Sequence, residues 1–448
     1  MAGFLEGKRV GILGMARSGI GAARLVHRLG GRALISDQKS ASALQTAIEE
    51  LAESGVEIET GTHRRIEEED FDLIVLSPGV IPSPSLQTAW ERHKTPVWSE
   101  LELASRACTR PFIAVTGSNG KTTTVHLIHA MLLAARRDSC LVGNVGNAWS
   151  NFLPTPVDRD FVVEVSSFQL ENTPTIRPRV AVLLNLFENH LDRHGTMAVY
   201  GELKSRLFRN QTESDTAVIN GDDSRVVALA QNFHAKTVRF GTSPHYDYWT
   251  DGDSLWYKEQ GQRRVIIPRA ALPLIGRHNE LNALAAAAAA FSHGVPMDSI
   301  RAALRSAQSV EHRIEFVVEK NGVRYVNDSK STNMVATQTA LDAFSDHVIL
   351  LFGGRPKRES FAPLARRFLH PVKHFIIFGE AVPKIKSELP NELPIAYTDT
   401  LSEALLQASG LAEPGDTVLL SPGCTSFDQF RDYEERGRVF KSCVEALP

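Results

Sequence analysis

The residues best suited to chemistry lie in a glycine-containing loop, Thr116-Gly117-Ser118-Asn119-Gly120-Lys121-Thr122-Thr123. Glycines let backbone N–H groups approach a phosphate closely, and the N-terminus of a helix favours anions. Lys121 adds a point charge for the β- and γ-phosphates, and the Thr122 hydroxyl is suited to ligating Mg²⁺. Val115 replaces the first glycine of the P-loop motif, but a strand pattern precedes the loop and a helical pattern follows it. The segment is therefore predicted to bind a nucleoside triphosphate.

A second glycine loop lies near the N-terminus, from Gly11 to Gly19. Its spacing does not fit the dinucleotide motif, because Leu13 and Ala16 stand where G-x-G-x-x-G has glycine. Gly14 nevertheless opens a helix N-terminus, and Asp37 ends the following strand. The pattern favours a nucleotide-like anion over NAD, while a turn without any ligand remains an alternative.

Three further residues could complete a metal site. Glu164 ends an apolar strand, where its neighbours Val163 and Val165 indicate burial, so its carboxylate could share Mg²⁺ with Thr122. His190 lies in a polar Asn-His-Leu-Asp loop after another strand and is predicted to be a second Mg²⁺ ligand, with a structural role as the alternative. Lys204, in a helix-like stretch, would by itself be read as a surface lysine.

Short β-branched strands alternate with helical stretches along most of the chain, which predicts an α/β fold with parallel sheets. Three domains are expected, at residues 1–99, 100–309 and 310–448. The alanine-rich run at 283–291 is predicted to be a buried helix, and residues 247–268 an irregular, strand-like hairpin addition. Strands are predicted at 10–13, 33–37, 56–60, 73–76, 112–115, 161–165, 180–184, 217–220, 238–240, 324–327, 348–352, 375–378 and 417–420.

Composition narrows the class of protein. The 448 residues are 43% hydrophobic and 23% charged with a net charge of -3, which is typical of a globular chain without a bulk basic surface for nucleic acid. The four cysteines form no C-x-x-C pair, as expected of a reducing compartment. No run reaches the ~18 apolar residues of a membrane helix. A cytoplasmic protein without nucleic-acid or membrane partners is expected.

Six further blocks occur in one order along the chain and, with the P-loop, resemble the Mur ligases of peptidoglycan synthesis. The blocks are Leu76-Ser77-Pro78-Gly79, Asn189-His190-Leu191-Asp192-Arg193-His194, Gly276-Arg277-His278-Asn279-Glu280-Leu281-Asn282-Ala283, Glu311-His312-Arg313, Asn327-Asp328-Ser329-Lys330-Ser331-Thr332-Asn333 and Leu420-Ser421-Pro422-Gly423-Cys424-Thr425-Ser426-Phe427-Asp428. The resemblance covers essentially the whole chain. It implies a Rossmann-like N-terminal domain, a central P-loop ATPase-like domain and a C-terminal Rossmann-like domain.

The resemblance also implies a reaction and its participants. The expected activity is ATP-dependent ligation of D-glutamate to UDP-N-acetylmuramoyl-L-alanine through an acyl phosphate, by a monomer. Three anions would then crowd together, so Mg²⁺, lysine and arginine are expected to offset their repulsion. The family carries a carbamylated lysine that orients a second Mg²⁺, and the spacing from Tyr200 identifies it here as Lys204. Lys121, His190 and Lys204 are the expected catalytic residues.

The binding residues implied by the resemblance fall into three groups. ATP is assigned Gly117, Ser118, Asn119, Gly120, Lys121, Thr122, Thr123, Asn279, Asn282, Arg313 and Asp328. The UDP substrate is assigned Met15, Ala16, Arg17 and Ser18 through backbone N–H groups, Asp37 and Gln38 near the uracil, and Ser77, Gly79 and Asn144. D-glutamate is assigned Lys330, Thr332, Lys357, Ser426, Phe427 and Tyr433.

The sequence departs from the family pattern in two places, and it leaves alternative roles for two residues and alternative functions for the chain. In Gly353-Gly354-Arg355-Pro356-Lys357 the arginine and proline are unexpected, and Tyr433 replaces a phenylalanine. As alternative roles, Asn279 would be a good N-cap for the alanine-rich helix and Ser426 a fair N-cap for a helix start. Other functions that the sequence leaves open are a sibling Mur ligase, folylpolyglutamate synthase, a nucleotide-gated binding protein and an NAD-dependent oxidoreductase.

Overall fold

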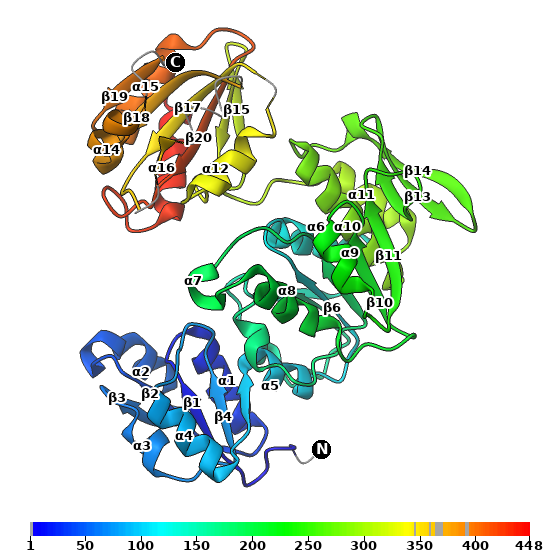
Figure 1. Cartoon of the computed structure of the whole chain (residues 1–448), viewed down its shortest axis with the longest axis vertical. Helices are drawn as coiled ribbons and strands as arrows, with labels where there is room; N and C mark the ends of the chain where they lie inside the picture. Colours follow the sequence, from blue (N-terminus) through cyan, green and yellow to red (C-terminus); the bar gives the residue numbers. More distant parts are fainter. Residues whose placement is uncertain (1–2, 345, 358–359, 363–370, 390–393) are drawn as a thin grey trace. The chain divides into compact units, whose positions relative to one another are not determined.

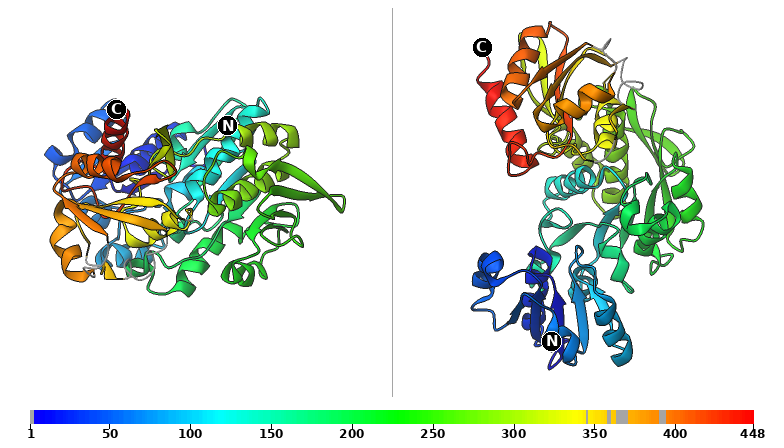
Figure 2. Two further views of the ribbon diagram at one scale, coloured as in Figure 1. Left: turned by 90° about the horizontal axis from the view of Figure 1, so that it is seen from above. Right: turned by 60° about the vertical axis from the view of Figure 1, so that its left-hand side comes forward.

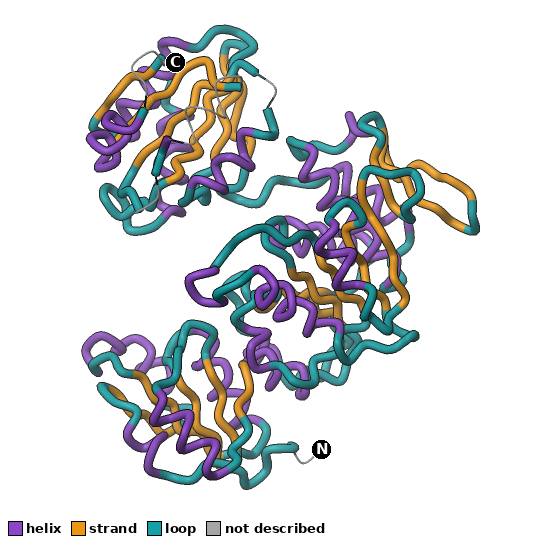
Figure 3. Tube along the Cα trace, viewed as in Figure 1, coloured by secondary structure: helices purple, strands orange, loops and turns teal. Residues whose placement is uncertain are grey.

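The computed structural model describes residues 3–344, 346–357, 360–362, 371–389 and 394–448. The chain forms two compact units, one of Met1–Pro273 with Glu280–Ala307 and the other of Leu274–Asn279 with Gln308–Pro448. The first unit contains two of the three sheets and the second unit contains the third. The predicted boundaries at 99/100 and 309/310 stay predictions, whereas the α/β class is confirmed (Figures 1 and 3).

The N-terminal sheet has the strand order β3-β2-β1-β4-β5, and every pairing in it is parallel. Helices lie on both of its faces, so its central strands are apolar on both sides. The carboxyl ends of β1, β2 and β4 therefore bring the first glycine loop, Asp37 and Ser77 to one edge. The elements are β1 (Arg9–Leu13), α1 (Arg17–Arg28), β2 (Arg32–Asp37), α2 (Gln45–Leu51), β3 (Glu57–Thr60), α3 (Arg64–Glu68), β4 (Leu73–Leu76), α4 (Pro84–His93), β5 (Val97–Ser99) and α5 (Glu100–Ala107).

The second sheet has nine strands in the order β14-β13-β12-β11-β10-β9-β6-β8-β7. The irregular region predicted at 247–268 forms β12, β13 and β14, and the β13–β14 hairpin projects from the body of this sheet (Figures 1 and 2). The sheet comprises β6 (Phe112–Thr116), β7 (Ser139–Gly143), β8 (Asp160–Glu164), β9 (Val180–Leu183), β10 (Thr216–Asn220), β11 (Lys236–Gly241), β12 (Tyr248–Thr250), β13 (Ser254–Glu259) and β14 (Gln262–Pro268).

The helices of this region include the predicted alanine-rich helix, α10, in which Ala283 through Ala290 are fully buried. Small side chains allow close packing, which explains the run of alanines. The helices are α6 (Lys121–Ala134), α7 (Leu191–His194), α8 (Met197–Ser205), α9 (Ser224–Ala230), α10 (Arg277–Ser292) and α11 (Met297–Arg305). None of the described helices combines the length and apolar character that a bilayer-spanning helix requires.

The second unit is built on a six-stranded sheet of order β15-β16-β20-β17-β18-β19, in which only β15 is antiparallel to its neighbour among the described strands. β20 lies centrally, so the loop that follows it is placed next to those after β16 and β17. The elements are β15 (Glu315–Lys320), β16 (Val323–Asn327), α12 (Met334–Leu341), β17 (Val348–Gly353), β18 (Val372–Phe378), α14 (Val382–Glu388), β19 (Ile395–Thr398), α15 (Leu401–Leu411), β20 (Thr417–Gly423) and α16 (Tyr433–Glu445).

Candidate active site

The glycine loop lies, as predicted, between a buried strand and a helix N-terminus. β6 is buried along its whole length, and α6 begins at Lys121. Gly120 has φ 83°, and a Cβ on it would come 2.3 Å from the side-chain oxygen of Asn282. A larger residue would clash there. The same contact places Asn282, predicted from α10, directly against the loop.

Two lysines converge on one carbonyl oxygen of this loop. Lys121 Nζ donates to Gly117 O at 2.8 Å and to Ser118 O at 2.9 Å, and Lys204 Nζ donates to the same Gly117 O at 2.9 Å. Lys204 is 1% exposed, so it is not the surface residue that its isolated pattern suggests. Burial and then the charge of Lys121 hold the pKa of Lys204 well below its usual range, against the opposing effect of Glu164. Its amine is therefore unusually easy to deprotonate.

Asn185, which the sequence interpretation missed, forms hydrogen bonds with the backbone of the P-loop. Its Oδ1 accepts from Asn119 N at 2.8 Å, its Nδ2 donates to Asn119 O at 3.2 Å, and its backbone oxygen accepts from Ser118 N. The Ser118 hydroxyl lies 3.1 Å from the hydroxyl of Tyr200, one turn before Lys204 on α8. Asn185 follows β9 in a position where an asparagine is usually read as a turn residue, which is why the pattern gave no signal.

The candidate metal ligands Glu164 and Thr122 are in direct contact. Thr122 Oγ1 donates to Glu164 Oε2 at 2.8 Å, and Asn144 Nδ2 donates to Oε1 of the same carboxylate at 2.7 Å. Glu164 is 2% exposed, which confirms its expected burial. Asn144, assigned to the UDP substrate, thus lies beside the candidate metal ligands.

This donor set fits Mg²⁺, since Mg²⁺ typically binds through one or two carboxylates, a hydroxyl and substrate phosphates rather than a protein cage. The described residues hold no group of three or more His, Cys, Asp or Glu side chains that could together hold a metal ion.

His190 stands at the start of α7 in a left-handed backbone conformation, φ 55°, and is exposed. Its ring lies 4.9 Å from that of Phe168, and Phe168 in turn lies 5.2 Å from the ring of His194. His194 is buried, contacts the ring of Tyr200 at 5.6 Å, and shares a 3.0 Å hydrogen bond with Ser167 Oγ. No role was assigned to His194 from the sequence. In the structure its ring packs between Phe168, which contacts His190, and Tyr200, which lies on the same helix as Lys204.

The N-terminal loop is braced by its own acidic and hydroxyl residues. Met15 N donates to Asp37 Oδ2 at 2.8 Å, and Ser77 Oγ donates to Gly14 O at 3.1 Å. The Met15 N–H therefore donates to Asp37 in this structure, and its assignment to a diphosphate stays a prediction. The first N–H groups of α1 have no intrahelical acceptors, which keeps Arg17 and Ser18 suited to an anion.

The other predicted UDP-side residues lie in this loop or in the segments that follow β2 and β4. Ala16, Arg17, Gln38 and Gly79 are exposed. A Cβ on Gly146 would lie 3.1 Å from Arg17 Nη1, so the guanidinium rests against the loop that carries Asn144. The first glycine loop and the Glu164–Asn144 pair are thereby connected within the first unit.

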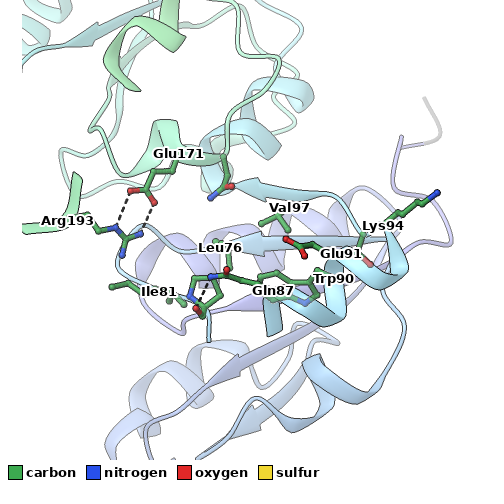
Figure 4. Close-up of a pocket in the computed structure, with 13 residues that line it drawn as sticks. Leu76, Ile81, Gln87, Trp90, Glu91, Lys94, Val97, Glu171 and Arg193 are labelled. Atoms are coloured by element: carbon green, nitrogen blue, oxygen red, sulfur yellow. Dashed lines mark hydrogen bonds and ion pairs between the residues drawn. The ribbon is translucent and has the colours of Figure 1, made fainter. Parts of the chain in front are cut away.

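A cavity of 570 Å³ lies next to the loop that follows β4 (Figure 4). Leu76, Val80, Ile81, Trp90 and Val97 give it an apolar side. At its other side Arg193 forms a double hydrogen bond with Glu171, at 2.7 and 3.2 Å. The cavity thus joins the loop of Ser77 and Gly79 to the segment that carries His190.

In the second unit, Asp328 follows β16 and is buried. Its Oδ2 accepts from Ser421 Oγ at 2.7 Å and its Oδ1 from Ile314 N at 3.2 Å. Burial raises the pKa of Asp328 to about 6, against the lowering effect of these hydrogen bonds. Lys330 Nζ lies 3.7 Å from the ring centroid of Tyr433, a cation–π contact that connects two residues predicted for D-glutamate.

The loops after β17 and β20 lie side by side. Arg355 and Thr425 exchange both backbone hydrogen bonds, at 2.9 and 3.1 Å, which sets the Gly353–Lys357 segment beside the Ser426 loop. Gly353 (φ 146°) and Gly354 (φ 120°) make the required turn. The unexpected Arg355 is explained by its side chain, which pairs with exposed Glu380 at 2.8 Å. Lys357 is exposed, and its carbonyl accepts from Lys384 at 3.0 Å.

The remaining predicted residues of this unit are placed as follows. Ser426 is 2% exposed, Phe427 is 60% exposed and Thr332 is half-buried. No described helix begins at Ser426, because α16 starts at Tyr433 with Asp432 as its N-cap, so the N-cap alternative is wrong. Arg313 precedes β15, and its N–H donates to Val310 O.

Asn279 is likewise not an N-cap, because α10 begins two residues earlier at Arg277. The Asn279 amide instead donates to Ile275 O at 2.8 Å. Asn279 and Asn282 are both on α10, but Asn279 belongs to the second compact unit and Asn282 to the first.

Comparisons with known proteins agree with this arrangement. The Mur ligase middle domain model matches residues 115–290, and the Mur ligase glutamate ligase domain model matches residues 312–424. A UDP-N-acetylmuramoylalanine–D-glutamate ligase of Geobacillus sp. (strain WCH70) is 40% identical over 453 residues, covering 99% of both chains. One of Acidobacterium capsulatum is also 40% identical, covering 99% of this chain and 97% of the relative.

Solved structures of lower identity share the fold. A Thermotoga maritima MurF ligase in complex with ADP has a TM-score of 0.61 at 18% identity, covering 92% of this chain and 95% of its own. The UDP-N-acetylmuramate–alanine ligase of the same organism has a TM-score of 0.58 at 19% identity, covering 98% and 99%. Since its relatives are 40% identical along nearly its whole length, this chain belongs to the Mur ligase family.

Proposed function

We propose that the protein is an ATP-dependent ligase that joins D-glutamate to UDP-N-acetylmuramoyl-L-alanine, a step in the synthesis of the peptidoglycan precursor. The proposal is supported by relatives that bear this activity in their names and are 40% identical along nearly the full length of this chain. The observation in the site that carries the proposal is the convergence of Lys121 and Lys204 on one P-loop carbonyl, next to the buried Thr122–Glu164 pair. The protein is further proposed to act in the cytoplasm as a monomer.

The proposed reaction activates a carboxylate at the P-loop. The carboxylate of UDP-N-acetylmuramoyl-L-alanine attacks the γ-phosphorus of ATP, so that ADP leaves and an acyl phosphate forms. The D-glutamate amine then attacks the acyl carbon, and phosphate leaves from the tetrahedral intermediate as the amine loses its proton. The loop N–H groups and Lys121 hold the triphosphate, with Asn282 bracing the turn at Gly120.

Mg²⁺ is assigned to Thr122 and Glu164, with His190 as the proposed ligand of a second ion. Bound Mg²⁺ would neutralise part of the phosphate charge. Glu164 is held in place for this role because Thr122 and Asn144 each donate to one of its oxygens.

Lys204 is proposed to be carbamylated. A lysine must be deprotonated to attack CO₂, and burial beside Lys121 favours that neutral form. The amine nitrogen bonds to the carbon of CO₂ and releases one proton, which leaves a carboxylate in place of a cation. This carboxylate would face the loop of Lys121 and orient the second Mg²⁺.

D-glutamate is assigned to the second unit, where cations and hydroxyls surround the carboxyl ends of β16, β17 and β20. Lys330, Lys357 and Thr332 are suited to its two carboxylates, with Ser426, the Phe427 backbone and Tyr433 at the rim. Arg313 and Asp328 are assigned to ATP on the family resemblance. On the UDP side, the loop from Met15 to Ser18 is assigned to the diphosphate, and Asp37 and Gln38 to the uracil.

The test is phosphate release by the purified protein with ATP, Mg²⁺ and UDP-N-acetylmuramoyl-L-alanine, comparing D-glutamate, L-glutamate, L-lysine and meso-diaminopimelate. Release that requires D-glutamate is expected. Release with meso-diaminopimelate or L-lysine alone would assign the chain to a sibling ligase, and no amino-acid-dependent release would reject the ligase function.

A further inference from the structure

Among the described residues of the second unit, the largest fully buried charged side chain belongs to a residue with no role in the proposed reaction. Arg436 lies one turn into α16, three residues after Tyr433, and its side chain is fully buried. A buried arginine is normally found with a carboxylate partner, since an isolated charge is costly to bury. Its hydrogen bonds here go instead to a hydroxyl and to carbonyl oxygens of two loops.

The guanidinium connects the segments that carry the proposed D-glutamate residues. Its Nε donates to Ser329 Oγ at 3.0 Å and its Nη2 to Ser329 O at 2.8 Å, next to Lys330. Its Nη1 donates to Cys424 O at 3.1 Å, two residues before Ser426. A Cβ on Gly354 would lie 3.2 Å from Nη1, so the group also rests against the segment leading to Lys357.

The same cluster fixes the start of α16. Ser329 Oγ, which accepts from Arg436, donates to Tyr433 O at 2.7 Å, and the Tyr433 ring in turn contacts Lys330 Nζ. The planar fork of arginine reaches three acceptors at once, which the single ammonium of a lysine does not reproduce.

The charge itself is retained at neutral pH. Burial lowers the pKa of Arg436 to about 10, with the nearby carboxylates of Asp428 and Asp328 acting in the opposite direction. The group therefore stays a cation under the conditions of an assay, and its field adds to that of Lys330 in favouring an anionic ligand.

We propose that Arg436 is the positioning residue of the amino-acid pocket: it holds the Lys330 and Ser426 loops at the separation that D-glutamate requires, without touching ATP or the UDP substrate. This inference rests on the proposed function and adds a residue that acts through Ser329 and Cys424. Its loss should therefore weaken D-glutamate binding selectively.

The test compares Arg436→Lys with Arg438→Lys, a matched control on the same helix whose side chain is exposed and pairs with Glu434. Arg436→Lys is expected to raise the KM for D-glutamate about tenfold or more, because two of three charge-assisted hydrogen bonds are lost. The KM values for ATP and the UDP substrate should stay within about twofold, and Arg438→Lys should leave all three unchanged.

A second readout separates positioning from simple destabilisation. Label exchange between ADP and ATP, with the UDP substrate present and no amino acid, should survive in Arg436→Lys. An unchanged KM for D-glutamate in the folded variant, or an equal loss of exchange and of complete turnover, would overturn the inference.

If Arg436→Lys does not fold, Ser329→Ala decides, since it removes the acceptor of Nε and leaves the arginine in place. A raised KM for D-glutamate supports the inference and an unchanged one rejects it. Failure of the proposed function would be seen separately, as a wild-type enzyme that does not respond to D-glutamate at all.

Discussion

Removal of the Asn185 side chain tests whether the P-loop is held from outside its own motif. In Asn185→Ala the loop loses two hydrogen bonds, Asn119 N to Oδ1 at 2.8 Å and Nδ2 to Asn119 O at 3.2 Å. The backbone oxygen of residue 185 still accepts from Ser118 N, so the loop should loosen at Asn119 without unfolding.

The size of the effect follows from the number of bonds. A neutral hydrogen bond contributes ~0.5–1.5 kcal/mol net. Two such bonds amount to about 1–3 kcal/mol, which corresponds to a 5- to 150-fold loss in affinity (roughly, at 1.4 kcal/mol for each factor of ten). We expect the KM for ATP to rise by this factor, since Asn119 lies in the loop that binds the phosphates.

The assay is phosphate release at saturating D-glutamate and UDP substrate over a range of ATP concentrations. Asn210→Ala is the matched control, because Asn210 is also half-buried and donates to two backbone carbonyls, Pro174 O at 3.0 Å and Ile176 O at 3.2 Å. The reasoning is refuted if Asn185→Ala keeps the wild-type KM for ATP, or if the control raises it equally.

Four further predictions concern five residues, each changed singly. Lys121→Ala should reduce turnover about a hundredfold (~3 kcal/mol) with the fold intact by circular dichroism, and near-normal phosphate release would reject the P-loop assignment. Lys204→Ala should lose activity that formate or acetate partly restores, whereas rescue by an amine would mean that the lysine acts as a cation. Ser426→Ala should raise the KM for D-glutamate but not for ATP, and Lys330→Ala should do so more strongly, by ~1.5–3 kcal/mol; equal effects on both substrates would withdraw the pocket assignment. Because the pKa of Asp328 is raised to about 6, its contribution to stability is present below its unfolded pKa and lost as pH rises through 6. In urea unfolding, the stability of Asp328→Asn relative to wild type should therefore be higher at pH 7.5 than at pH 4.5, by about 2 kcal/mol, and an equal difference at both pH values would contradict this.

The sequence predicted those parts of the site whose function and local structure coincide. The P-loop has to join a strand to a helix, so its pattern identifies β6 and α6 as well as the phosphate site. Glu164 was predicted to be buried because apolar neighbours flank it. The alanine-rich stretch was predicted to be a buried helix because its own side chains are small and apolar.

The contacts that depend on tertiary structure could not be predicted. Asn185 and the P-loop are 66 residues apart in the chain, and Arg436 reaches Ser329 across 107 residues. Nothing in the local pattern distinguishes Arg436 from a solvated arginine, since its environment is created by loops from other strands. The hairpin in 247–268 was predicted from its local pattern, whereas its place at the edge of the nine-stranded sheet depends on tertiary structure.

The central claim is that the chain joins D-glutamate to the carboxylate of a UDP-linked substrate. It is tested most directly by mass spectrometry of the UDP-containing product after incubation with ATP, Mg²⁺, UDP-N-acetylmuramoyl-L-alanine and either D- or L-glutamate. The account predicts a mass increase of one glutamyl residue with D-glutamate alone, in equal amount to the ADP formed. An unmodified UDP substrate with D-glutamate, or the same increase with L-glutamate, would contradict it.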